Sequence, residues 1–280
     1  MKKYLLVSGL CGVLLLSMRL SSLEVYATES NGQTKSDAAF EAGDRPSPGK
    51  PEEGPKDPST LDPDVDPEDP TKPKPLPESG NVYVTHLPTI SFGSNKTKVE
   101  TSEYGAVMEK RTKNEGKIGF YMPHSIQVAD LSGKGDSKWS VSVQQEDVFK
   151  TSDNKLQLTD SRIRLYGNTL TNSSYKTEDL SGKIDGVNME QKDKFGTYAQ
   201  IPLASDKSSL TILNSKTEGF TLNSYTSSVF SSDYKESDYD ETKTPKESRY
   251  EGVRLNVPSN DKVQLKNYQA NLVWTLTIEP

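Results

Sequence analysis

After Gly80 the sequence consists of short runs in which apolar and polar residues alternate, separated by Gly, Asn, Ser and Asp. The clearest runs are VYVTHLPTISFG, KWSVSVQQE, KLQLTDSRIRLYG, SSLTILN, GVRLNVP and NLVWTLTI. Alternation with a period of two, rich in β-branched and aromatic residues, is typical of strands with one buried face, and turn residues recur about every ten positions. The sequence therefore predicts an all-β domain over residues 80–280, an antiparallel β-sandwich or a barrel of about eight to twelve strands.

The stretch before this domain has a different composition. Most of the 17 prolines gather in GKPEEGPKDPSTLDPDVDPEDPTKPKPLPESG, which is also rich in Asp and Glu. Proline fixes φ, removes a backbone donor and disfavours helix at the residue before it. The stretch also has little apolar surface to bury. We therefore expect residues 28–79 to be a disordered, acidic and extended segment.

The N-terminus has the pattern of an export signal. Lys2 and Lys3 precede the apolar run YLLVSGLCGVLLLSM, and the small-residue site VYA ends just before Thr28. The apolar run is about 15 residues long, shorter than the roughly 20 that span a bilayer. We expect residues 1–27 to be a signal peptide that is removed on export. The single cysteine, Cys11, lies inside it, so disulfides play no part in the exported chain.

The charged and titratable residues give little support for catalysis. The net charge of −6 excludes a strong general attraction to nucleic acid. His86 and His124 belong to no recognisable hydrolase or metal motif, and we expect them to be satisfied polar residues. The acidic run SDYKESDYDE (232–241) lacks the glycine of a calcium loop and is interpreted as solvated charge. We expect no catalytic residue, no metal and no cofactor.

Residues 224–250 interrupt the strand pattern with a long polar insertion. Loops of this length are usually functional or disordered. Two interpretations stay open, a mobile surface loop or a loop that contacts a partner or glycan. In the second case, Tyr234 and Tyr239 are the candidate contact residues.

Two segments share one shape, KWSVSVQ (138–144) and VWTLTIE (273–279). In an extended strand, alternate side chains point to opposite faces, so each tryptophan lies on the apolar face of its strand. The alternation predicts that both rings are buried in the core. The residues of the two apolar faces that matter here are Trp139, Val141, Trp274 and Leu276. Ser140 and Thr275 lie on the opposite faces and are candidate contact residues.

The C-terminal segment YQANLVWTLTIEP (268–280) resembles the distal motif of the WxL-domain proteins of Gram-positive cell surfaces. Supporting matches are ISFG, VADLSGKGDSKW, KLQLTDSRIRL and VRLNVPSN, and together they cover about residues 80–280. The proximal motif departs from the pattern, because Val141 stands where the family usually has leucine. Valine is apolar and β-branched and still suits a buried strand position.

This resemblance implies a secreted, non-catalytic protein held on the cell wall. Its implied partners are peptidoglycan and companion wall-associated proteins with a WxL-interacting domain. Another wall polymer and host extracellular molecules stay open as further partners. The chain ends at TIEP without a covalent sorting signal, so we expect non-covalent attachment.

Two other functions stay open at this point. One is an adhesin for glycans or host molecules, in which the tryptophan strands are purely structural and the exposed aromatic residues lie on the 224–250 loop. The other is a secreted glycan-active enzyme, which would place a carboxylate of shifted pKa in a cleft.

Overall fold

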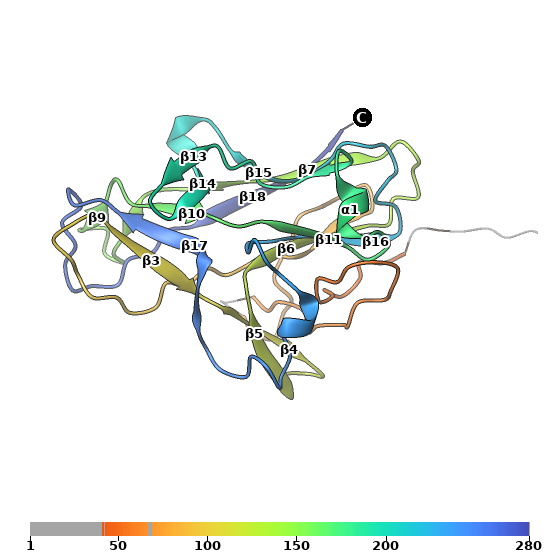
Figure 1. The fold of residues 1–280 in the computed structure, drawn as a ribbon, viewed down its shortest axis with the longest axis horizontal. Helices are drawn as coiled ribbons and strands as arrows, with labels where there is room; N and C mark the ends of the chain where they lie inside the picture. Colours follow the sequence, from red (N-terminus) through yellow and green to blue (C-terminus); the bar gives the residue numbers. More distant parts are fainter. Residues whose placement is uncertain (1–40, 42, 67–68, 280) are drawn as a thin grey trace, which may run out of the picture. The chain divides into compact units, whose positions relative to one another are not determined.

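The computed structural model describes residues 41, 43–66 and 69–279, so the expected signal peptide lies outside the described residues. Within them the fold is all-β, with 18 strands and three short helices (Figure 1). There are more strands than the sequence predicts because several are only two or three residues long. All ladders between these strands are antiparallel.

Three larger sheets contain most of the strands. In spatial order, the first sheet consists of β1 (Glu78–Ser79), β2 (Val82–His86), β6 (Ser125–Asp130), β16 (Ser224–Val229) and β11 (Thr169–Asn172). The second consists of β13 (Gln191–Asp193), β14 (Gly196–Gln200), β10 (Arg162–Leu165), β17 (Arg249–Val257) and β3 (Ser102–Val107). The third consists of β12 (Ile184–Asp185), β15 (Leu210–Ser215), β7 (Lys138–Gln145) and β18 (Leu272–Glu279). The described strands form open sheets and no closed barrel.

Two hairpins and the short helices complete the described fold. The hairpins are β4 (Glu109–Lys113) with β5 (Ile118–Met122), and β8 (Phe149–Lys150) with β9 (Gln157–Leu158). The helices are α1 (Thr177–Leu180), η1 (Ala204–Asp206) and η2 (Glu236–Asp238). Each is a single turn, so the strands supply almost all of the core.

One core joins the three sheets. Its buried side chains include Val84 and Ile126 from the first sheet, Leu165 from the second, and Val141 and Leu213 from the third. The alternation of the sequence explains this arrangement, because one apolar face of each strand meets the other sheets in the interior. This is the sandwich-like packing expected from the period-two pattern.

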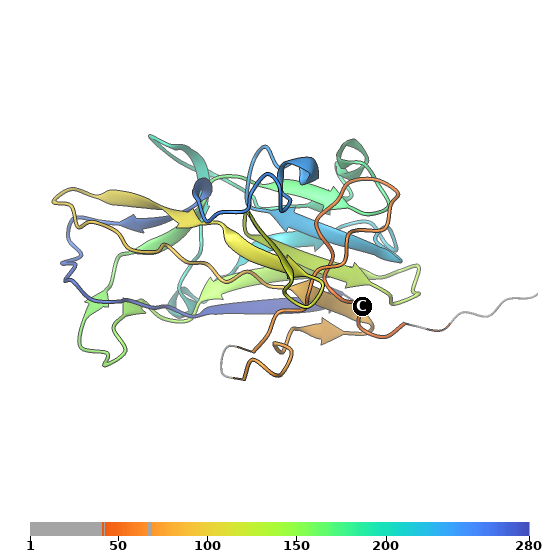
Figure 2. The same ribbon diagram turned by 90° about the horizontal axis from the view of Figure 1, so that it is seen from below.

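The Pro-rich segment is ordered where the structure describes it, which corrects the expectation of disorder for these residues. Gly49 donates its N–H to Oε1 of Gln127 at 2.7 Å, and Nε2 of Gln127 donates to the carbonyl of Gly49 at 2.9 Å. Leu61 is buried. The segment, orange in Figure 2, lies along the first sheet and covers its polar face, so all six residues of β6 are buried. Composition does not predict this order, because the contacts are made by backbone amide groups and a single leucine.

Strand β16 lies in the insertion that we expected to be a loop. It forms a ladder with β6 on one side and β11 on the other. Its sequence, SYTSSV, has no apolar alternation, and its hydroxyl groups bond to polar side chains of the neighbouring strands, Asn172 of β11 and Gln127 of β6. Thr226, Ser227 and Ser228 are all buried. The irregular part of the insertion therefore begins after Val229.

Replacing Gln127 with alanine is expected to loosen the Pro-rich segment. The change leaves the buried N–H and carbonyl of Gly49 without partners, which costs about 1 to 3 kcal/mol of folding stability. Brief proteolysis should then cut residues 43–61 faster than in the wild type. Lys134→Ala, at an exposed turn, is the matched control and should change neither quantity. An unchanged cleavage pattern in Gln127→Ala would contradict the role of this contact.

Candidate functional site

The two tryptophan strands are neighbours in the third sheet. β7 and β18 pair along all eight residues of each strand. Trp139 lies opposite Ile278, and Trp274 lies opposite Val143. The two tryptophans are thus four residues apart along the ladder, about 13 Å at roughly 3.3 Å per residue. They face the same side of the sheet from opposite ends of the strand pair.

Trp139 is a core residue, as its alternation predicts. Its exposed fraction is 1%, and its indole Nε1 donates to Oγ1 of Thr221 at 3.0 Å. Thr221 in turn donates to Oδ2 of Asp130 at 2.9 Å. Val141, two residues further along β7, is completely buried. The proximal motif is therefore structural, and the indole N–H is satisfied inside the protein.

Trp274 differs, because β18 is the edge strand of its sheet. Trp274 and Leu276 pack against the core but are only half-buried. On the other face Val273 is 38% exposed, and Thr275 is also exposed. Trp274 thus packs on the core side of its strand, as the alternation predicts, but is buried only in part, since no further strand covers the outer side of β18 among the described residues.

The candidate contact residues on the outer face lie in a short polar area. Thr275 of β18 and Thr211 of β15 are both opposite Ser142 of β7, so the three form one row across the sheet. Ser140 is two residues from Ser142 on the same face and is half-buried. This face is polar, and Thr275 is the member of the row nearest the free edge.

The candidate contact tyrosines of the insertion do not form an exposed pair. Tyr234 is buried, and its hydroxyl donates to the carbonyl of Pro51 at 2.9 Å. The ring of Tyr239 stacks on it with centroids 5.4 Å apart. Tyr234 is therefore not available to a partner, and Tyr239 is half-buried. The sequence does not indicate that Tyr234 is buried, because its apolar partner Leu61 lies far away in the Pro-rich segment.

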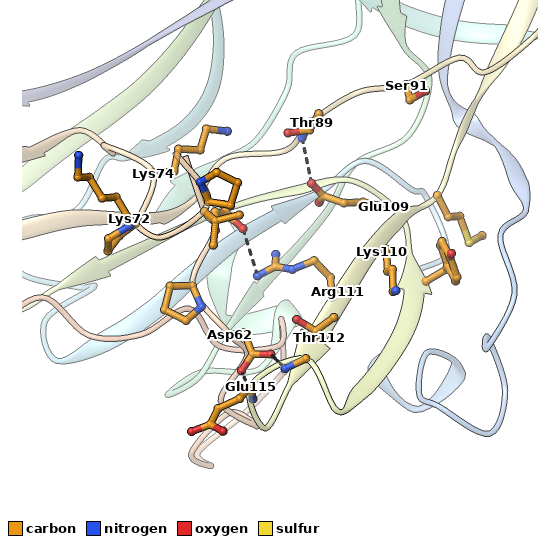
Figure 3. A pocket seen from close by; sticks show the side chains of 18 of the residues that line it. Asp62, Lys72, Lys74, Thr89, Ser91, Glu109, Lys110, Arg111, Thr112 and Glu115 are labelled. Carbon is orange, nitrogen blue, oxygen red and sulfur yellow. Dashed lines mark hydrogen bonds and ion pairs between the residues drawn. The ribbon is translucent and has the colours of Figure 1, made fainter. Parts of the chain in front are cut away.

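A cavity of about 1030 Å³ lies between the Pro-rich segment and strand β4. Figure 3 shows Asp62, Lys72 and Lys74 on one side and Glu109 and Arg111 of β4 on the other. A cavity of this size holds a ligand of several residues or rings.

A buried ionic cluster lies next to the cavity. Nδ1 of His86, at the end of β2, is 2.8 Å from Oδ2 of Asp64, and its Nε2 is 2.9 Å from Oε2 of Glu109. The other oxygen of Glu109 accepts the backbone N–H of Thr89 at 2.9 Å. Asp64 belongs to the Pro-rich segment, so the cluster ties that segment to β2 and β4. As expected from the sequence, His86 is a satisfied buried residue.

The three members of this cluster stabilise one another's charged forms. Burial and Arg111 lower the pKa of His86, but Glu109 and Asp64 raise it more, and the net pKa lies above the ordinary 6.5. Burial raises the pKa of Asp64, but His86 and Arg111 lower it to about 2. Burial likewise raises the pKa of Glu109, and His86 more than offsets this, so the net pKa is lowered. Both carboxyls are therefore ionised at neutral pH.

His124 has a different environment. Its Nδ1 is 2.8 Å from the hydroxyl of Tyr250, and its Nε2 is 3.1 Å from the carbonyl of Thr89. Burial lowers the pKa of His124. It is a neutral core histidine, as the sequence suggests. In the described part of the chain, no three His, Cys, Asp or Glu side chains are placed to hold a metal ion.

The comparisons with known proteins give one result. A family model described as the WxL domain, surface cell wall-binding, matches residues 27–280. The chain belongs to the WxL domain family. No curated protein and no solved structure matches it. The WxL family places the protein at the cell wall, on the cell surface.

The two motifs of the WxL domain thus have different surroundings. The proximal motif is in the core, where Val141 fills the position of the usual leucine with no exposed surface. The distal motif is on an edge strand, with its apolar face half-covered.

Among the described residues, no helix is long and apolar enough to cross a membrane.

Sequence reasoning missed the cavity and the ionic cluster. The available signals were a histidine at the end of an apolar strand, VYVTH, and an isolated leucine among prolines. Neither signal indicates which residue the histidine or the leucine contacts. Asp64 and His86 are 22 residues apart, and only the folded chain brings them together.

Proposed function

We propose that this protein is held non-covalently on the cell wall by a non-catalytic domain. Its partners in this proposal are peptidoglycan or another wall polymer and a companion wall protein with a WxL-interacting domain. The family match supports wall binding. The contact with the companion protein is assigned to strand β18, which contains the distal motif.

The observation that carries this proposal is the free edge of β18. An edge strand presents unpaired backbone N–H and C=O groups, and proteins usually protect such edges with lysine, proline, a bulge or shortness. β18 is eight residues long, pairs with β7 without a bulge, and has the sequence LVWTLTIE with neither lysine nor proline. Strand β1 approaches β18 but forms no ladder with it. Such an edge suits strand addition by a partner.

The side chains of β18 favour a protein strand as the occupant. Strand addition gives affinity through main-chain hydrogen bonds and specificity through alternate side chains. On β18, the half-covered Trp274 and Leu276 face one side, and Thr275 and Thr277 face the other. A partner strand with an apolar and a polar face would cover the first pair and extend the polar face.

The non-catalytic part of the proposal is supported by the direction of the carboxyl pKa shifts at the cavity. A general acid of a glycosidase needs a carboxyl whose pKa is raised toward neutrality. At the cavity, both Asp64 and Glu109 have lowered pKa values and are bound to His86. Neither is poised to donate a proton.

Thr275→Arg is expected to weaken retention on the wall while leaving the fold intact. The side chain is exposed at the edge, so unfolding stability should change by about 0.5 kcal/mol or less, while the arginine obstructs an added strand. The retained protein would be measured on cells washed with high salt.

Thr211→Arg is the matched control, because it adds the same charge in the same row of the sheet but away from the edge. It should be retained like the wild type. Normal retention of Thr275→Arg would contradict the edge contact. Release of the wild type only after muramidase digestion, with wall fragments attached, would contradict non-covalent attachment.

A further inference from the structure

A second, smaller cavity lies where the distal motif begins. It has a volume of about 380 Å³ and is formed by the connection between β7 and β8, the turn of the β8–β9 hairpin, and residues 269–271 just before β18. This volume is at the lower end of the range for small-molecule sites, about 300 to 1,000 Å³. Eight of its ten lining residues are polar or charged, and only Val148 and Ala270 are apolar. A ligand of this cavity would therefore be held mainly by hydrogen bonds.

Backbone hydrogen bonds hold the frame of the cavity in place. The N–H of Glu146 donates to the carbonyl of Asn271 at 2.9 Å, and Lys150 and Gln269 exchange two backbone bonds, each of 2.9 Å. In the hairpin turn, the N–H of Asn154 donates at 2.8 Å to the carbonyl three residues before it. The side chains that line the cavity thus start from an ordered backbone, which lowers the entropy cost of binding a ligand.

Three of the lining side chains are accessible and have free hydrogen-bonding groups. Ser152, Asn154 and Gln269 are all exposed, and within the described part of the chain none of their side chains forms a hydrogen bond. One hydroxyl and two amides provide both donors and acceptors. An apolar ligand would remove these groups from water without replacing their hydrogen bonds, at a cost in free energy. A suitable ligand must therefore both donate and accept.

The charges of the lining disfavour an anion. The lining contains two carboxylates, Glu146 and Asp147, and one cation, Lys150. Nζ of Lys150 is already 2.9 Å from Oδ2 of Asp147, and Nδ2 of Asn271 donates to Oε2 of Glu146 at 2.9 Å. An anionic polymer would meet excess negative charge and a lysine that is already paired. The lining therefore favours an uncharged ligand.

We propose that this cavity binds an uncharged sugar. The hydroxyl and acetamide groups of sugars donate and accept hydrogen bonds in the same way as the free side chains of the lining. The side chains of a peptide would find only Val148 and Ala270 as apolar contacts, so a peptide fits less well. This inference rests on the proposed function for the source of the sugar, which is the glycan strand of the wall. A host glycan has the same chemistry, and the experiment separates the two sources.

The experiment titrates the purified chain with soluble probes and follows its backbone amide signals by NMR. The probes are a trimer of N-acetylglucosamine, N-acetyllactosamine, an acetylated trialanine amide and a glycerol phosphate oligomer. The trimer should bind at least about tenfold more tightly than the peptide or the phosphate oligomer, the difference expected for two or three additional hydrogen bonds. Tighter binding of the trimer than of N-acetyllactosamine assigns the wall as the source of the sugar, and the reverse order assigns a host glycan.

Gln269→Ala should weaken binding of the trimer by about five- to tenfold, because it removes one amide from the cavity. The change leaves both backbone bonds with Lys150 in place, so the fold should be retained. Ser152→Ala should weaken binding by about fivefold, the loss expected for one hydrogen bond. Gln264→Ala is the matched control, because it removes an exposed glutamine from the same segment outside the cavity. It should bind the trimer like the wild type.

Wild-type affinity in both Gln269→Ala and Ser152→Ala, tightest binding of the peptide or the phosphate oligomer, or no binding of either sugar would each overturn this assignment. Retention on washed cells is measured separately. A chain that binds no sugar but is retained on cells would overturn this inference alone, whereas loss of retention in the wild type would overturn the proposed function.

Discussion

Trp139→Ala is expected to lower the free energy of unfolding by about 3 to 5 kcal/mol, the range for a fully buried large side chain. The indole lies inside the core between the sheets, and its removal leaves a cavity that the neighbouring strands cannot fill without moving. It also removes the donor to Thr221. Chemical denaturation followed by circular dichroism would measure the change.

Two further variants test the contrast between the motifs. Trp139→Phe keeps most of the apolar surface and loses the N–H, so it should cost about 1 to 2 kcal/mol. Trp274→Ala, on the half-covered edge strand, should cost about 1 to 2 kcal/mol because less apolar surface is lost. If Trp274→Ala destabilised the domain more than Trp139→Ala, the assignment of core and edge would be wrong.

His86→Leu is expected to lower the free energy of unfolding by about 3 to 5 kcal/mol, because it leaves two ionised carboxylates without their shared partner in a buried site. Asp64 and Glu109 then repel each other across the position of the lost ring. The Pro-rich segment should loosen with the same change, since Asp64 is one of its links to β2. Thermal unfolding and proteolysis of residues 43–66 measure these two effects.

The pH dependence of the cluster follows from the direction of each pKa shift. The folded pKa of His86 is raised above 6.5, so its contribution is complete below 6.5 and is lost as pH rises through the folded value. The pKa values of Asp64 and Glu109 are lowered from 3.8 and 4.5. Their contributions are present above those values and are lost as pH falls through the folded ones. The cluster therefore stabilises the fold most between about pH 4.5 and 6.5.

His86→Gln isolates this effect, because glutamine keeps hydrogen-bonding groups but does not titrate. Burial lowers the pKa of His124, and His86 is a smaller cause in the same direction, so the opposite pH dependence of His124 cancels only in part in the comparison. The stability difference between the wild type and His86→Gln should be larger at pH 5.5 than at pH 8.5. A difference independent of pH would show that His86 is not charged in the cluster.

The strands of this protein follow from its sequence where one face is apolar and the other polar. KWSVSVQQ and LVWTLTIE alternate through their whole length, and both form eight-residue strands at the expected positions. The family also follows from the sequence, because the motif YQANLVWTLTIEP is local and needs no knowledge of the fold. The two-residue alternation and the family motif each involve only residues close together in the chain, so both can be recognised in the sequence without the fold.

The strand SYTSSV and the order in the Pro-rich segment depend on the tertiary structure. Both lack an apolar pattern, and they contact each other: the hydroxyl of Tyr225 donates to the carbonyl of Ser47 at 3.1 Å, across 178 residues of sequence. Contacts made by backbone groups and small polar side chains leave no periodic signal, so the sequence pattern predicts neither the strand nor these contacts.

The difference between the two tryptophans was likewise decided only by the position of their strands. Both lie on apolar faces with the same alternation, yet β7 has a neighbour on each side and β18 has one. The sequence determines which face of a strand is apolar, because side chains alternate along the backbone. How much of that face is covered depends on which strands lie beside it, and that is settled by pairings between residues far apart in the chain.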